Sequence, residues 1–157
     1  MKKIDVQIIV GSKSDEEKIR QALVVLDEFS VSYDFKIASA HRSPSHVEEI
    51  IDSAINSGVK VFITGAGMAN HLSGAVSART VLPVIGVPFS GGISGGMDSL
   101  LATVQMPPGV PVATVAVDGA KNAAILALEI LSIENKDLQK KLIEYRHKEA
   151  EKIRAGS

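Results

Sequence analysis

The chain has 157 residues, a size that fits one compact domain. Its 17 Lys and Arg residues and 18 Asp and Glu residues give a formal net charge of −1, which argues against nucleic acid and acidic membranes as partners. Cysteine is absent, which excludes disulfides, thiol catalysis and thiolate metal sites. The apolar stretch near the N-terminus is short and is interrupted by Asp5 and Gln7, so we expect a cytoplasmic protein without a signal peptide or membrane span.

Short apolar runs alternate with segments of helical period, which predicts an α/β fold with a parallel sheet covered by helices. The first predicted strand is Ile4–Val10. The run Ser14-Asp15-Glu16-Glu17 follows with the Ser-x-x-Glu spacing of a capping box, and it predicts the start of a helix. A second strand is expected at Tyr33–Ala38, and Ser43-Pro44 then supplies a cap and the first residue of a second helix, which continues to Gly58.

The second half of the chain repeats this pattern. Strands are predicted at Val59–Thr64, Leu82–Val87 and Val112–Val117, and helices at Asn70–Arg79, Asp98–Gln105 and Ala120–Leu131. Residues Gly65–Ala69 are expected to form a tight turn. The glycine-rich residues 89–96 carry too little side chain to pack a core, which predicts a mobile loop.

The tail from Asn135 to Arg154 is predicted to be a long, charged helix. It has one narrow apolar stripe, made of Leu138, Leu142, Tyr145 and Ile153. Such a helix lies either across its own domain or on another subunit, and the thin stripe favours the second arrangement. We therefore interpret residues 1–157 as a single domain, with an α/β core over 1–132 and a C-terminal helix over 133–157.

Small polar residues gather in the loops that follow the first four predicted strands, at residues 11–15, 39–43, 65–71 and 88–97. In a doubly wound parallel sheet, ligands bind beyond the carboxyl ends of the strands. The first loop offers hydroxyl groups and backbone amides at the start of a helix, which suits a phosphate group. Alternatively, Ser12 is only a turn residue, and Ser14 and Asp15 only cap the helix. The sequence has neither a Walker loop nor a dinucleotide fingerprint, so NAD and FAD are not expected.

The second loop places His41 beside Arg42 at the end of a strand. An arginine binds phosphate or carboxylate groups, and histidine is the side chain best suited to exchange protons near pH 7. The alternative is a solvent-facing histidine beside an arginine in a surface ion pair. His71 lines the pocket or packs within a short helix. A metal site of His41, His71 and Asp15 is conceivable, but no local pair of ligands on one helix face supports it.

Seven runs of sequence, taken together, resemble the PurE family of N5-carboxyaminoimidazole ribonucleotide mutases. They are GSKSD at 11–15, SAHRSP at 39–44, GAG at 65–67, HL at 71–72, LPVIGVP at 82–88, DSLL at 98–101 and VQMPPGVPVATVA at 104–116. The resemblance extends from the first strand to the helix that ends near Leu131. It implies a flavodoxin-like three-layer α/β/α fold with a long C-terminal helix, a homo-octamer, and a reaction without metal or organic cofactor.

The resemblance also assigns roles to residues. The family's reaction moves a carboxylate from the exocyclic nitrogen of a ribonucleotide carbamate to carbon 4 of its aminoimidazole ring, in the biosynthesis of purines. His41 matches the catalytic histidine, which would act as both acid and base. Positions that match nucleotide contacts are Ser12, Ser14 and Arg42 for the phosphate and Asp15 for the ribose. The ring and CO2 pocket would be lined by Ser39, Ala40, Gly67, His71 and Leu72.

Three positions depart from the usual family run, in which glycine, alanine and proline stand where this chain has Met68, Asn70 and Ser73. Asn70 and Ser73 are similar to residues of the related aminoimidazole ribonucleotide carboxylases, which use free CO2. Arg42 and His71 are instead typical of the mutases, which we favour. A nucleotide-binding module without catalysis, using the same loops, is a third hypothesis.

Overall fold

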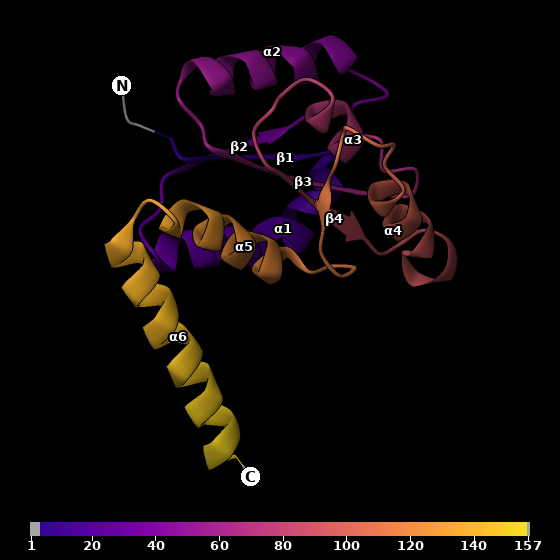
Figure 1. The fold of residues 1–157 in the computed structure, drawn as a ribbon. Helices are drawn as coiled ribbons and strands as arrows, with labels where there is room; N and C mark the ends of the chain where they lie inside the picture. The colour runs from indigo at the N-terminus through magenta and orange to yellow at the C-terminus, as the bar shows by residue number, and fades with distance from the viewer. Residues whose placement is uncertain (1–3, 157) are drawn as a thin grey trace.

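The computed structural model describes residues 4–156, in which a five-stranded parallel sheet lies between two layers of helices (Figure 1). The strands are β1 (Val6–Val10), β2 (Tyr33–Ile37), β3 (Val61–Gly67), β4 (Val84–Phe89) and β5 (Ala113–Thr114). The helices are α1 (Glu16–Glu28), α2 (Pro44–Asn56), α3 (Leu72–Ser77), α4 (Met97–Val104), α5 (Ala120–Ser132) and α6 (Lys136–Ala155), with short 3-10 turns η1 (Lys13–Asp15) and η2 (Ile93–Gly95).

The strand order is β2-β1-β3-β4-β5, and every neighbouring pair is parallel. This is the order of flavodoxin-like sheets, in which the direction of winding reverses between β1 and β3. The predicted fold class is therefore confirmed. The loops after β1 and β3 leave the same edge of the sheet at this reversal, so this edge is where a ligand site is expected.

The two faces of the sheet carry separate apolar cores. On one face, alternate β1 residues such as Ile8 pack with α1, α5 and the start of α6. On the other face, Ile9 packs with α2 and α3. The side chains of adjacent strand residues point to opposite faces, which explains why the central strands are apolar at nearly every position.

The predicted turn at Gly65–Ala69 is wrong for its first three residues, because β3 continues through Gly67 and pairs with β4 as far as Phe89. The reason is the close approach of Phe89, whose buried ring lies over the backbone of Gly65. A Cβ atom on Gly65 would come within 2.6 Å of Phe89 Cε2. Glycine here marks a strand that another side chain covers, not a turn.

Three further predictions need correction. The fifth strand has only two residues, because β5 pairs with β4 at Ile85 and Gly86 alone. The third helix is shorter than predicted and covers 72–77. The first two helices begin near the predicted residues, but neither Asp15 nor Ser43, the residues at their N-caps, makes a side-chain capping hydrogen bond. Pro44 does occupy the first turn of α2, as predicted.

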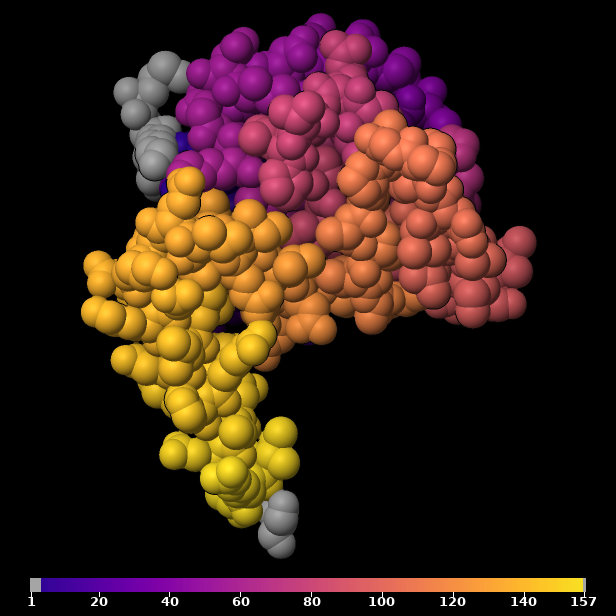
Figure 2. Space-filling view, in the orientation of Figure 1, coloured from indigo at the N-terminus to yellow at the C-terminus, as the bar shows by residue number. Residues whose placement is uncertain are grey.

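The C-terminal helix α6 packs on its own domain along its first half. Leu138 and Leu142 are buried, and the ring of Tyr145 meets Phe29 of the segment after α1 edge-on at 5.6 Å between centroids. This part of the apolar stripe is therefore not free to contact another subunit. The remainder of α6, with the exposed Ile153, projects away from the body (Figures 1 and 2). Within residues 4–156, no helix is both long and apolar enough to cross a membrane.

Candidate active site

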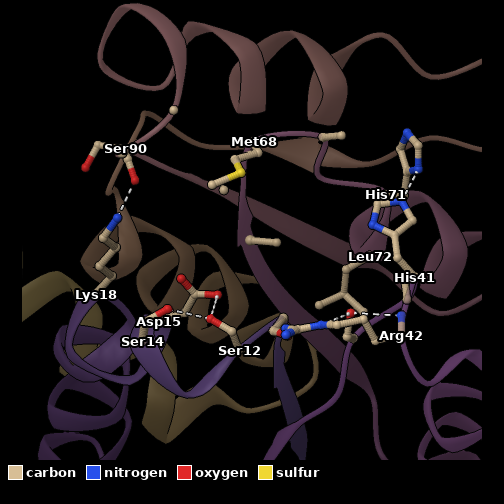
Figure 3. A pocket seen from close by; sticks show the side chains of 18 residues that line it. Ser12, Ser14, Asp15, Lys18, His41, Arg42, Met68, His71, Leu72 and Ser90 are labelled. Carbon is tan, nitrogen blue, oxygen red and sulfur yellow. Dashed lines mark hydrogen bonds between the residues drawn. The ribbon is translucent and has the colours of Figure 1, made fainter.

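A cavity of about 640 Å³ opens at the carboxyl edge of the sheet, where the winding reverses (Figure 3). Its walls are residues 11, 12, 14, 15 and 18 after β1, residues 39–42 after β2, residues 66–69, 71 and 72 at the end of β3, and residues 90–92 after β4. Cavities of this volume typically hold a small organic ligand. All ten residues predicted for the site line this one cavity, although their chemical roles remain predictions.

The loop after β1 turns its side chains toward one another and not toward the helix amides. Ser12 Oγ lies 2.6 Å from Ser14 Oγ and donates to Asp15 Oδ2 at 3.1 Å. The alternative in which Ser14 and Asp15 only cap the helix is therefore wrong, because neither side chain contacts the helix amides as a cap. Two hydroxyl groups and a carboxylate stand together at the cavity wall, where they can bind a hydroxylated, phosphorylated ligand.

The loop after β2 is tied to the loop after β1 through Arg42. Ser39 Oγ accepts hydrogen bonds from the Arg42 backbone N at 3.2 Å and from Arg42 Nε at 3.3 Å, and Arg42 Nη2 donates to the carbonyl oxygen of Gly11 at 3.3 Å. An arginine side chain has five N–H donors, so these contacts orient the guanidinium and leave donors for an anionic ligand. The alternative in which Arg42 forms a surface ion pair is wrong, because its side chain donates to the Ser39 hydroxyl and the Gly11 carbonyl oxygen and, within the described part of the chain, to no carboxylate.

Two histidines from separate loops meet in the cavity. His41 Nε2 lies 2.5 Å from His71 Nδ1, and the two rings are 4.5 Å apart at an angle of 70°. Such a hydrogen bond needs a proton on only one of the two nitrogens, so the pair can pass a proton in either direction. His71 is exposed to the cavity at the start of α3, which excludes the alternative that it packs within that helix. His46 lies apart on α2, 3.5 Å from Glu49.

Two of the three unusual positions do not face the cavity. Asn70 and Ser73 are fully buried, and Asn70 Nδ2 donates to Thr103 Oγ1 at 2.8 Å and to Ser73 Oγ at 3.2 Å. Thr64 Oγ1 donates to Ser73 Oγ at 2.9 Å. These polar side chains join β3, α3 and α4 below the site, so Asn70 and Ser73 support the site and do not touch a ligand.

Five further residues of the cavity wall that carry a side chain were not among the predicted site residues, and Lys18 and Met68 are the largest of them. Lys18 Nζ donates a short hydrogen bond to the carbonyl oxygen of Ser90, which joins α1 to the loop after β4 (Figure 3). The spacing of four residues from Ser14 could have indicated Lys18, since it places both side chains on one side of a helical turn. Met68 also lines the cavity, and Figure 3 shows its side chain between Lys18 on one side and the histidine pair on the other. The only signal for it was its departure from the family run.

No metal site emerges from these residues. Across the described residues 4–156, no three or more His, Cys, Asp or Glu side chains lie where they could hold a metal ion together. The polar groups of the cavity bond to one another or face open space. The arrangement is thus suited to binding an anionic ligand and to moving protons through a histidine pair.

Comparison with known proteins gives consistent matches over nearly the whole chain. The model of the AIR carboxylase family matches residues 5–152. A curated N5-carboxyaminoimidazole ribonucleotide mutase of Pyrococcus abyssi is 52% identical over 141 residues, covering 90% of this chain and 81% of the relative. Another, of Methanocaldococcus jannaschii, is 51% identical over 149 residues, covering 95% of this chain and 92% of the relative.

A solved structure agrees with these matches. The crystal structure of a PurE2 variant of Treponema denticola has a TM-score of 0.89 and 30% sequence identity, and the match covers 96% of this chain and 94% of that one. The fold, the family match and the identity to relatives that are covered over most of their length lead to one conclusion: the chain belongs to the AIR carboxylase family.

Proposed function

We propose that this protein is an N5-carboxyaminoimidazole ribonucleotide mutase of purine biosynthesis. The main support is the sequence identity of 52% and 51% to two curated mutases, of which the matches cover 81% and 92%. The cavity adds chemical support, because it brings a histidine pair, an arginine and a polar loop together at the sheet edge. The product is 4-carboxy-5-aminoimidazole ribonucleotide.

The chemistry requires two proton transfers at one place. A proton delivered to the carbamate nitrogen breaks its bond to the carboxylate carbon and releases CO2. Carbon 4 of the freed aminoimidazole then attacks this CO2, forms the new C–C bond and loses its ring proton. We assign both transfers to His41, which gives the first proton and takes the second, so that it ends the cycle in its starting state. His71 holds the His41 ring through their 2.5 Å contact.

The remaining cavity residues bind the nucleotide in this proposal. Ser12, Ser14 and Arg42 receive the phosphate, and Asp15 accepts hydrogen bonds from the ribose hydroxyls. Ser39, Ala40, Gly67 and Leu72 form the wall around the ring and CO2. The contact of Arg42 with the Gly11 carbonyl keeps the phosphate site and the histidine loop at a fixed separation.

We further propose that the protein forms a homo-octamer. Several large apolar side chains are exposed on the single chain, among them Val81, Leu101 and Ile153. Contacts with other subunits would remove these side chains from water, which favours assembly. Light scattering of the purified protein tests this proposal, and a monomer would contradict it.

A direct assay tests the proposed reaction. The purified protein is given the carbamate ribonucleotide in CO2-depleted buffer, and in parallel aminoimidazole ribonucleotide with bicarbonate, and products are identified by absorbance and mass. We expect rapid product formation from the carbamate alone. Product from neither substrate, with nucleotide binding intact, would indicate the non-catalytic module.

The second candidate function is an aminoimidazole ribonucleotide carboxylase that uses free CO2. The description of the matching family model, AIR carboxylase, favours it. Asn70 and Ser73 do not, because both are buried away from the cavity and cannot contact a substrate. In the assay above, a carboxylase forms product only from aminoimidazole ribonucleotide with added CO2.

A further inference from the structure

Met68 has a backbone conformation that is unusual for its side chain. Within residues 4–156, the non-glycine residues with positive φ are Ser30, Met68, Ser94 and Asp118, and Met68 has φ 52°. The left-handed region favours glycine, the residue that the family usually has at this position, because a Cβ atom crowds the backbone there. Short polar side chains such as that of Asp118 tolerate this region better, because they can hydrogen-bond to the nearby backbone. A thioether has no such bond to offer.

The strain at Met68 is not offset by burial within the chain. Its side chain is 66% exposed, and it lines the cavity. Figure 3 shows it above the cavity, between the end formed by Lys18 and Asp15 and the end formed by the histidine pair. Met68 combines this strain with a place in the cavity wall, which Ser30 lacks, and strain of this kind gathers at functional positions.

A methionine suits one need of the proposed reaction. The CO2 released from the carbamate is uncharged, so the polar groups of the cavity hold it weakly, and it must meet carbon 4 before it diffuses away. Closing walls that exclude water retain such an intermediate. Methionine is unbranched and has three rotatable bonds, so its side chain adapts to the shape of a bound ligand.

We propose that Met68 is a positioning residue whose side chain covers the bound aminoimidazole ring and retains CO2 until it is transferred. This inference rests on the proposed mutase function. It is specific to this chain, because the glycine that the family usually has at this position has no side chain to form such a wall. Met68 takes no part in bond making: the N–C bond of the carbamate breaks, the C–C bond forms, and His41 handles both protons, as described above.

The proposal predicts that Met68→Gly both raises the thermal stability of the protein and weakens its retention of CO2. The glycine relieves the left-handed strain, so the midpoint of thermal unfolding rises by about 2–4 °C. At the same time the cavity loses its cover, so CO2 exchanges with the solvent. If Met68 served only the fold, its replacement by glycine would change the thermal stability of the protein but not its retention of CO2.

The experiment follows the origin of the carboxylate. Unlabelled carbamate ribonucleotide is converted in buffer that contains ¹³C-bicarbonate and carbonic anhydrase, and the ¹³C fraction of the product is measured by mass spectrometry against a reaction without enzyme. We expect the wild type to give little label and Met68→Gly to give on the order of tenfold more, because unlabelled CO2 that leaves the uncovered cavity is replaced by labelled CO2 from the buffer. Met68→Leu, which keeps an apolar cover, should stay near the wild type.

Ser30→Gly is the matched control, because Ser30 has φ 58° and lies just beyond the far end of α1, outside the cavity wall. It should raise thermal stability without raising the label. If the wild type gives little label and the ¹³C fraction of the product is equally low with Met68→Gly, the proposal is overturned. The mutase function is then still supported. Loss of the wild-type oligomeric state in Met68→Gly, seen by light scattering, also overturns the proposal, because Met68 would then be an interface residue. Full label in the wild-type product contradicts the mutase function itself.

Discussion

His41 and His71, thirty residues apart in the sequence, are joined by a hydrogen bond of 2.5 Å between Nε2 and Nδ1. One histidine lies in the loop between β2 and α2 and the other immediately precedes α3, so the contact bridges two neighbouring loops at the sheet edge. Because either nitrogen of the contact can donate the hydrogen bond, the orientation of the His41 ring and the tautomers of the two histidines depend on this contact.

The first prediction distinguishes the contributions of His41 and His71 to the reaction. His41→Asn should lower kcat by at least about 10²-fold, since it removes the group that moves both protons. His71→Asn should lower kcat less, because His41 keeps its own proton chemistry and loses only a partner. Steady-state kinetics with the carbamate ribonucleotide checks both variants, and nucleotide binding by calorimetry should persist in each.

His46→Asn is the control for these variants, because His46 is exposed on α2 and contacts only Glu49 among the interactions found for it. It should turn over like the wild type. Normal turnover by His41→Asn would refute the assignment of the acid and base to His41.

The second prediction concerns the close approach of Phe89 to Gly65. Gly65→Ala should lower the free energy of unfolding by about 1–3 kcal/mol, because its methyl group would overlap a fully buried ring. Chemical denaturation checks this, with Gly156→Ala as a control at a position where a Cβ atom meets only ordinary contacts. The double variant with Phe89→Leu should recover part of the loss. If it recovers none, the overlap is not the cause.

Much of the fold could be predicted because apolar runs and helix signals are local. The apolar alternation of β1 and β3, Pro44 at the start of α2 and the period of α6 each report on nearby residues. The prediction failed where a distant residue decides the structure. Gly65 and Gly67 resemble a turn, yet they belong to a strand because Phe89 lies twenty-odd residues away in the sequence and pairs beside them.

The same distinction applies to the site. The loops after parallel strands meet at one edge, so the sequence could place Ser12, Ser39 and Gly67 together from topology alone. It could not show that Asn70 turns inward to Thr103, or that Lys18 reaches across to Ser90, because these contacts depend on the packing of helices against the sheet.

The third prediction tests the buried polar cluster. Asn70→Ala should lower the free energy of unfolding by about 1–3 kcal/mol, because Thr103 and Ser73 each lose a buried hydrogen-bond partner. The reaction type should not change, since Asn70 does not line the cavity. Denaturation and the labelled-bicarbonate assay measure the two properties, with the exposed Ser45→Ala as a control. A switch to dependence on added CO2 would show that Asn70 does influence the chemistry.

The last prediction concerns Lys18, which links α1 to the turn at residues 90–92. Its ammonium group donates to the Ser90 carbonyl oxygen and lies 5.8 Å from the centre of the Phe89 ring. Lys18→Met keeps much of the side-chain length but removes the donor, so the turn loses one of its two polar anchors, the other being the contact of the Ser90 amide with Asp118. We expect KM for the nucleotide to rise about fivefold, which corresponds to the loss of one hydrogen bond of about 1 kcal/mol.

The value of kcat should stay nearly unchanged in Lys18→Met, because Lys18 and the histidine pair lie at opposite ends of the cavity (Figure 3). Lys13→Met is the matched control: Lys13 is exposed in η1, just before α1, and does not line the cavity. It removes the same charge without the link to Ser90, so its KM should remain near the wild type. Equal increases in KM for the two variants would assign the effect to the positive charge near the start of α1 and not to the contact with Ser90.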